Sequence, residues 1–103
     1  MTATPKPRRV ERVRLSLPIP ATAATVRAFV LDVSLRGFLI AHKEPLSETK
    51  ACRLSFEWHG RPIAVDCRVV HSGKTSGDLY HTGLEMLHEA PAGLRALIES
   101  HRV

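Results

Sequence analysis

The sequence predicts a mainly β protein, a small antiparallel β-barrel that ends in one short helix. Two observations support this fold class. Short segments of alternating apolar and polar residues follow one another with turns between them, and a helical period appears only at the C-terminal end. The 103 residues allow one hydrophobic core. We therefore expect a single domain built on a closed or sandwiched sheet.

The N-terminal segment differs from the rest of the chain. Residues 1–7 contain Pro5 and Pro7 and show no apolar periodicity. Such a segment is typical of an extended leader. We expect a leader over residues 1–7 and an ordered domain over residues 8–103.

Three segments of the first half predict strands. Leu15–Ile19 alternates with the period of a strand, but Pro18 and Pro20 lack the amides for ladder bonds on both sides. We interpret it as an edge strand or an extended lead-in. Val26–Val33 and Phe38–Ala41 are rich in β-branched and apolar residues, and the short interval between them predicts a tight turn.

The second half predicts three more strands. Ala51–Trp58 alternates in the manner of a half-buried strand, and a turn at His59 leads into Pro62–His71. A second turn is expected over Ser72–Asp78, followed by a last strand over Leu79–Leu87.

The period changes only after the last strand. Leu94, Leu97 and Ile98 recur at helical spacing, and Pro91 stands where the first turn of a helix tolerates proline. One short helix is expected to end the domain.

The net charge of +5 is concentrated near the N-terminus. Residues 1–14 hold five basic residues and one acidic residue, so the remaining chain is nearly neutral. A basic arm on a neutral body indicates an anionic partner, or a merely solvated arm.

Cys52 and Cys67 form neither a CxxC pair nor a metal-finger spacing, and we interpret them as core thiols. The sequence shows no signal peptide and no apolar run of the roughly 20 residues that span a bilayer. We expect a cytoplasmic protein without membrane insertion and without disulfides.

Catalytic and metal-binding signatures are missing from the sequence. GxSxG, P-loop and HExxH motifs do not occur, and the six histidines stand singly on different segments. His81 and His88 are seven positions apart on one strand, which directs them to opposite faces. We therefore expect no enzyme activity, no metal and no cofactor.

Two short motifs carry the candidate site residues. Arg8 and Arg12 form an RxxxR pair, whose guanidinium groups suit phosphate oxygens, the O6 and N7 edge of guanine, and stacking on bases. Asp32, Ser34 and Gly37 form a DxSxxG pattern. This pattern fits a turn with a positive φ at the glycine, or a carboxylate and hydroxyl that hold a guanine edge.

Together these motifs resemble the PilZ domain. RxxxR is followed by DxSxxG twenty positions later, then by short strands, a glycine-containing last strand (YHTGLEM, residues 80–86) and a terminal helix. The resemblance runs from Arg8 to the end of the chain. It implies a six-stranded antiparallel barrel that binds cyclic di-GMP on its outer surface, with Arg8 and Arg12 on bases and phosphates, and Asp32, Ser34 and Gly37 on a guanine edge.

Three further residues are candidates under this resemblance. Arg9 is expected to contact a phosphate, and Arg36 either reaches a phosphate or faces solvent. His71 stands where relatives often carry an aromatic residue, so it either stacks on a base or is an exposed residue at the end of a strand. Trp58 alternates with core positions and is expected in the core.

The mechanism expected from the resemblance is that ligand phosphates fix the basic arm against the barrel, creating a surface for a partner protein. One alternative is a PilZ-type adaptor that binds no nucleotide and acts in motility, pilus assembly or secretion; the intact motifs count against it. Another is a basic barrel for RNA or single-stranded DNA, which needs exposed aromatic residues. Most aromatic residues occupy core-facing positions, so we expect no nucleic acid polymer as partner.

Overall fold

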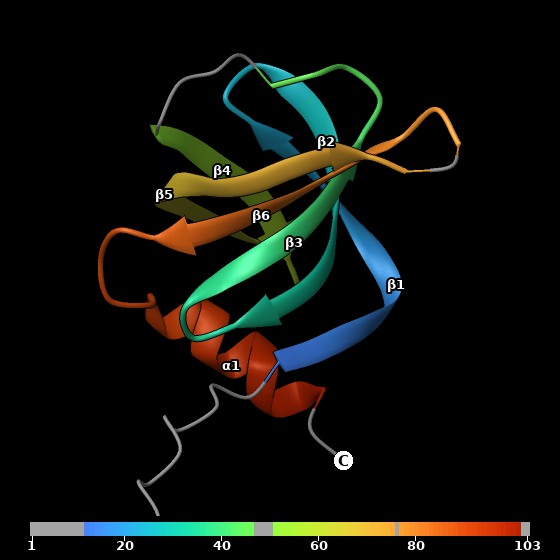
Figure 1. The fold of residues 1–103 in the computed structure, drawn as a ribbon. Coiled ribbons are helices and arrows are strands. Elements are labelled where there is room, and N and C mark those ends of the chain that lie inside the picture. Colours follow the sequence, from blue (N-terminus) through green and yellow to red (C-terminus); the bar gives the residue numbers. More distant parts are fainter. Residues whose placement is uncertain (1–11, 47–50, 76, 102–103) are drawn as a thin grey trace, which may run out of the picture.

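Six antiparallel strands form a closed barrel, and one helix follows them, in a computed structural model that describes residues 12–46, 51–75 and 77–101 (Figure 1). The strand order around the barrel is β1-β2-β3-β6-β5-β4. The elements are β1 (Arg12–Ala23), β2 (Val26–Ser34), β3 (Gly37–His42), β4 (Ala51–Trp58), β5 (Arg61–Lys74), β6 (Tyr80–Met86) and α1 (Ala92–Ser100). The predicted fold class is confirmed, whereas the predicted leader lies outside the described residues.

β1 is longer than the predicted segment, and its prolines lie where pairing is one-sided or broken. β1 pairs with β2, but the register shifts between Arg14 and Ile19, and Pro18 falls in this interval. Pro20 lies opposite Phe29 of β2, and pairing with β4 begins only at Ala21. The strand therefore closes the barrel through its last residues and leaves each proline without a two-sided ladder.

β5 extends further than predicted. The sequence placed a turn over Ser72–Asp78, but Ser72 and Lys74 continue the strand opposite Thr82 and Tyr80 of β6. The register shifts between Val69 and His71, as in a β-bulge, and the polar strand continues beyond it. Polar residues in a projecting strand end look like a turn in sequence because no apolar alternation marks them.

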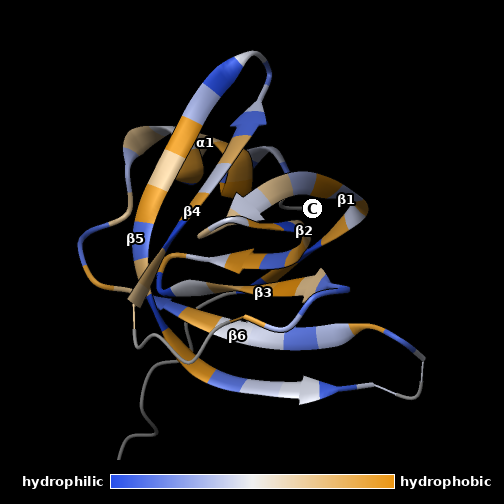
Figure 2. Cartoon of the chain, turned by 90° about the horizontal axis from the view of Figure 1, so that it is seen from above, coloured by the Kyte–Doolittle hydropathy of each residue, from blue (hydrophilic) through white to orange (hydrophobic). Residues whose placement is uncertain are grey.

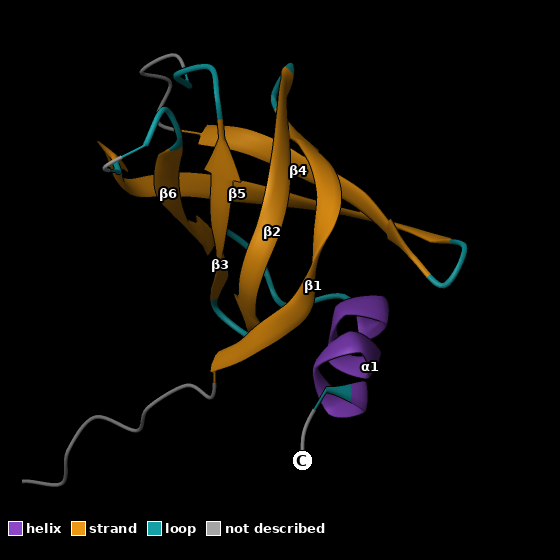
Figure 3. Ribbon diagram, turned by 90° about the vertical axis from the view of Figure 1, so that its right-hand side faces the viewer, coloured by secondary structure: helices purple, strands orange, loops and turns teal. Residues whose placement is uncertain are grey.

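The core fills the barrel and extends to α1. Hydropathy alternates along the strands in Figure 2, and the helix lies at one end of the barrel in Figure 3. Leu94, Leu97 and Ile98 of α1 are buried in the same cluster as Val13 of β1. Pro91 is the N-cap residue, and its carbonyl accepts the amides of the first turn. The helix prediction is thus confirmed, with the proline one position before the first turn.

Cys52 and Cys67 lie directly opposite each other on β4 and β5, and both are buried as free thiols. Burial raises the pKa of Cys52 and raises that of Cys67 to about 12. The prediction of core thiols is therefore confirmed. Within the described part of the chain, no helix is long and apolar enough to cross a membrane.

Candidate functional site

A row of residues crosses the outer wall of the barrel on five strands. Arg14 of β1 lies opposite Asp32 of β2, which lies opposite Leu39 of β3. Leu39 lies opposite Gly83 of β6, and Gly83 lies opposite His71 of β5. Because directly opposed residues of antiparallel strands share a face, the pairing places these five residues side by side. We call this set the first row.

A second row runs beside the first along the end of the barrel where β2 turns into β3. Arg12 lies opposite Ser34, at the end of β2. Gly37 opens β3 and lies opposite Glu85, which lies opposite Arg68. We call these five residues the second row, and its two halves meet at the Ser34–Gly37 turn.

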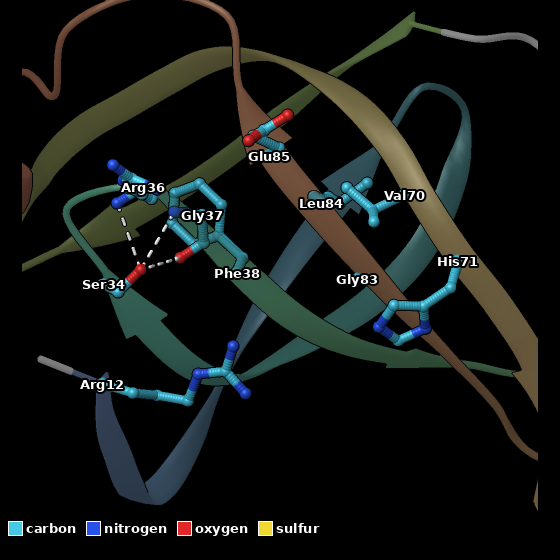
Figure 4. Close-up of a pocket in the computed structure, with 10 residues that line it drawn as sticks. All are labelled: Arg12, Ser34, Arg36, Gly37, Phe38, Val70, His71, Gly83, Leu84 and Glu85. Carbon is cyan, nitrogen blue, oxygen red and sulfur yellow. Dashed lines mark hydrogen bonds between the residues drawn. The ribbon is translucent and has the colours of Figure 1, made fainter. Parts of the chain in front are cut away.

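A pocket of about 230 Å³ lies where the two rows adjoin (Figure 4). It is formed by the end of β2, the start of β3 and inner residues of β5 and β6, with Arg12 of β1 at its border. The lining residues are Arg12, Ser34, Arg36, Gly37, Phe38, Val70, His71, Gly83, Leu84 and Glu85.

The pocket brings together five of the eight predicted site residues: Arg12, Ser34, Arg36, Gly37 and His71. Asp32 is not among the lining residues but stands in the first row, two residues before Ser34. Arg8 and Arg9 lie outside the residues that the structure describes. The DxSxxG residues and the second arginine of RxxxR are therefore neighbours in space, as a shared site requires.

Asp32 has an unsatisfied carboxylate. The residue is 7% exposed, and its Oδ1 atom is buried without a hydrogen-bond partner among the described residues. Arg14 Nε lies 3.8 Å from this oxygen, but the Arg14 side chain is 87% exposed. A buried carboxylate oxygen without a hydrogen bond is costly, so a hydrogen-bond donor brought to this atom would stabilise the protein.

Ser34 closes the turn between β2 and β3 with its own side chain. Its hydroxyl oxygen accepts the amides of Arg36 at 3.1 Å and Gly37 at 3.0 Å. The hydroxyl also contacts the Gly37 carbonyl oxygen, which accepts its proton at 3.3 Å. The turn interpretation of Ser34 is therefore correct in the structure described here, whatever ligand contact it also makes.

Gly37 does not have the positive φ that the turn interpretation assumed. Among the glycines of the described residues, only Gly60 has a positive φ. A Cβ on residue 37 instead meets the Leu84 carbonyl oxygen at 1.9 Å. Glycine is needed here because the backbones of β3 and β6 approach closely next to the pocket, which sequence alone does not reveal.

His71 lies in the pocket rather than apart from it. Its imidazole projects from β5 over Gly83, and a Cβ on residue 83 lies 2.5 Å from His71 Nε2 (Figure 4). Gly83 therefore leaves room for the ring above β6. The exposed ring stands beside a small opening of polar and apolar character, where a flat base can stack on it.

The charges around the pocket are mainly positive. Arg12 and Arg36, drawn in Figure 4, are exposed and have no ion-pair partner among the described residues. Glu85, by contrast, pairs with Arg68. Sequence reasoning missed Glu85, Arg68 and the role of Gly83. They lie on strands distant from both motifs, and only the register of β5, β6 and β3 brings them together.

Two other candidate positions have structural surroundings. Trp58 is partly buried, packs against the core as predicted, and stacks on His59 with ring centroids 4.1 Å apart. His88 Nε2 lies 3.9 Å from Asp66. In the part of the chain that the structure describes, no group of three or more His, Cys, Asp and Glu side chains is placed to hold a metal.

The fold and the site define a class of protein: a small closed β-barrel with an arginine-bordered pocket on its outer wall. The chain belongs to the PilZ domain family, whose model matches residues 6–101. PilZ is a family of cyclic di-GMP-binding domains, which act as receptors or adaptors and not as enzymes.

A solved structure of similar fold is that of the Bacillus subtilis inhibitor of motility MotI/DgrA, with a TM-score of 0.71 and 17% sequence identity. The similarity covers 91% of this chain and 49% of that protein, so the chain spans about half of its length. No curated protein sequence matches the chain.

Proposed function

We propose that this chain is a receptor for cyclic di-GMP that acts through a partner protein. The observation that carries the proposal is the buried Oδ1 atom of Asp32, which accepts no hydrogen bond from the described residues. Asp32 lies in the same row as His71 and beside a pocket bordered by Arg12 and Arg36. The site combines a buried acceptor, a ring and cations, which are the three elements that a guanine nucleotide needs.

Asp32 is the proposed reader of the base. An ionised carboxylate only accepts hydrogen bonds, and guanine offers the N1 and N2 protons side by side on one edge. Adenine presents an acceptor at N1 and therefore pairs poorly with a carboxylate. The burial of Asp32 adds to this selectivity because a wrong base leaves the carboxylate oxygen unsatisfied.

Arginines are the proposed phosphate contacts. Arg12 on β1 and Arg36 in the β2–β3 turn border the pocket. We include Arg8, the first arginine of the RxxxR motif, and Arg9, which follows it, among the proposed phosphate contacts. A guanidinium group pairs with two phosphate oxygens at once and also stacks on a base. We propose that ligand phosphates hold the segment bearing these arginines on the barrel wall, and that the surface so formed contacts a partner protein.

His71 is the proposed stacking platform. Its ring lies above Gly83 next to the pocket, and stacking on a histidine offers less contact area than stacking on a larger aromatic residue. We expect His71 to contribute to affinity without deciding which base is bound.

Calorimetric titration of the protein with cyclic di-GMP tests the function, with GTP and a short single-stranded oligonucleotide as controls. Saturable heat with the cyclic dinucleotide alone is expected, and the stoichiometry distinguishes one bound ligand from a stacked ligand dimer. Arg12→Ala and Asp32→Asn should each weaken binding, by about 2 kcal/mol for the lost charged hydrogen bond of Asp32. Arg61→Ala, an exposed arginine in the β4–β5 hairpin, serves as the matched control.

A second candidate is a PilZ-type adaptor that binds no nucleotide. The observation that favours it is that Ser34 and Gly37 already have structural roles. Ser34 closes the β2–β3 turn, and Gly37 allows the Leu84 carbonyl oxygen to come close to the backbone of β3. Both residues can therefore be retained without a ligand. Absence of heat with both cyclic di-GMP and the oligonucleotide, together with a melting temperature that cyclic di-GMP leaves unchanged, would exclude the receptor and favour the adaptor.

Binding of the oligonucleotide in the same titration would instead indicate the nucleic acid barrel. Three of the five described aromatic side chains argue against that function, since Phe38 and Phe56 are buried against each other and Trp58 packs on the core. Phe29, at 51% exposed, is the one exposed Phe, Trp or Tyr ring among the described residues. Cytoplasmic location stays a prediction, which fractionation of cells that produce the chain can test.

A further inference from the structure

We propose that Arg68 and Glu85 together set the charge of the pocket, with Arg68 as a positioning residue that neutralises Glu85 so that a ligand with two phosphates can bind. This inference rests on the proposed function, because it concerns the affinity of the same site. It adds two residues that lie outside both sequence motifs.

Among the described residues that line the pocket, Glu85 is the one carboxylate. It lies on β6 directly opposite Gly37, the last residue of the DxSxxG motif. On its other side Glu85 lies opposite Arg68 of β5, and a guanidinium nitrogen of Arg68 pairs with a carboxylate oxygen of Glu85. Arg68 itself does not line the pocket.

An unpaired carboxylate at this position repels phosphate groups. At a separation of about 6 Å, two unit charges interact by about 0.7 kcal/mol in water and about 3 kcal/mol at the effective dielectric of a protein surface. Pairing with Arg68 makes Glu85 part of a neutral unit. Arg12 and Arg36, which have no ion-pair partner among the described residues, then determine the potential of the pocket.

The Arg68–Glu85 ion pair contributes little to the folding stability of the barrel. The side chains of Arg68 and Glu85 are 57% and 41% exposed, and exposed ion pairs contribute little to folding. Variants at either position should therefore fold, which allows their effect on binding to be measured separately from their effect on the barrel.

A double-mutant cycle tests the proposal, by calorimetric titration of cyclic di-GMP into the wild type, Arg68→Met, Glu85→Gln and the double variant. Arg68→Met should weaken binding by about three- to tenfold, since it leaves Glu85 charged and unpaired. Glu85→Gln should bind as well as or more tightly than the wild type, and in its background Arg68→Met should cost clearly less affinity than in the wild type, because no carboxylate is left in the pocket for Arg68 to neutralise. At about 500 mM salt the loss in Arg68→Met should shrink, because screening weakens the repulsion.

The matched control is Arg53→Met, which breaks another exposed arginine–carboxylate pair, with Asp66, away from the pocket. Its affinity should equal that of the wild type. Urea unfolding of all variants confirms that the barrel is intact.

Five results would overturn the proposal. Equal losses for Arg68→Met with and without Glu85 would mean that Arg68 contacts a phosphate itself. A loss in Glu85→Gln alone would mean that Glu85 binds the ligand, and a loss in Arg53→Met would mean a general effect of charge. No loss in Arg68→Met overturns it directly. If the wild type binds no cyclic di-GMP, the proposed function falls as well; wild-type binding without coupling overturns only this inference.

Discussion

The carbonyl oxygen of Leu84 lies 1.9 Å from the position that a Cβ atom would occupy on Gly37. The absence of a side chain at Gly37 therefore allows β3 and β6 to approach this closely. This contact stands at the pocket, where Gly37 follows the Ser34 turn and Leu84 precedes Glu85. The glycine of the motif is therefore a requirement of the barrel as well as a candidate feature of the ligand site.

Gly37→Ala should destabilise the protein by about 2 kcal/mol, because the new methyl group meets backbone that cannot rotate away. Urea unfolding followed by tryptophan fluorescence measures the change. Gly73→Ala is the matched control, since a Cβ there has no atom within 4 Å, and it should change stability by less than about 0.5 kcal/mol. Equal stability of the two variants would contradict the close approach of β3 and β6.

Gly83→Ala should lower ligand affinity with little change in stability. The new methyl group meets the far end of the His71 ring, which can move aside, and the ring then leaves its place above β6. A lost stacking contact of about 1 kcal/mol corresponds to about fivefold weaker binding. His71→Ala should show a similar loss and the double variant no further loss in the same titration. Additive losses would show that Gly83 acts independently of His71.

The barrel and the helix could be predicted from the sequence because the alternation of apolar and polar residues and the presence of turn residues are local properties. The helix was predictable from the spacing of Leu94 and Leu97, and the core position of Cys67 from alternation within its strand. The end of β5 was not, because Ser72 and Lys74 are polar residues held in the strand by pairing with β6.

The candidate site was predictable only where motifs mark it. Arg12 and Ser34 belong to recognisable patterns and are register partners on β1 and β2. Glu85 and Arg68 reach the site through the pairing of β3, β6 and β5, which depends on a bulge beside Val69. Cross-strand register arises from the closed barrel as a whole, so no local pattern in the sequence reveals it.

Thr82→Val should destabilise the barrel by about 1 to 3 kcal/mol, because it leaves a buried imidazole nitrogen unpaired. His42 Nδ1 donates to the Glu44 carbonyl oxygen at 2.6 Å, and Nε2 of the same ring is hydrogen-bonded to the Thr82 hydroxyl at 2.7 Å. The Ser72 hydroxyl extends this chain by a hydrogen bond to the Thr82 hydroxyl at 2.7 Å. Thr22→Val, at an exposed position of β1, is the control for urea unfolding. Equal stabilities of Thr82→Val and Thr22→Val would show that the hydrogen bonds joining His42, Thr82 and Ser72 contribute nothing to folding stability.

Cys67 should be unreactive in the folded protein at about pH 8. The thiolate is the reactive form, and burial raises the pKa of Cys67 from 9.0 to about 12. Titration with a chromogenic disulfide reagent should modify the thiol only after unfolding in urea. Because the pKa of Cys67 is higher in the folded than in the unfolded protein, the protonated thiol contributes to folding stability. This contribution is complete below pH 9.0 and is lost as the pH rises toward about 12. Modification faster than global unfolding would contradict the buried position.

Asp66 should make folding stability depend on pH in the acid range. Arg53 donates a hydrogen bond to Asp66 Oδ1 at 3.0 Å, and this bond together with the guanidinium charge holds the carboxyl pKa below its ordinary value of 3.8, with a smaller effect from His88. A lowered pKa stabilises the folded state above the unfolded value. The stabilisation is therefore present above pH 3.8 and lost as the pH falls through the folded pKa.

The melting temperatures of the wild type and Asp66→Asn should differ at about pH 6 and converge as the pH falls below the folded pKa of Asp66, where the carboxyl group becomes protonated. Arg53→Met should raise the Asp66 pKa toward 3.8 in an NMR titration of the carboxyl carbon, because the hydrogen bond and the stronger of the two nearby positive charges both come from Arg53. His88→Ala should move it less, because that charge acts across 3.9 Å without a hydrogen bond. A larger shift in the His88 variant would reverse the assignment of the dominant partner.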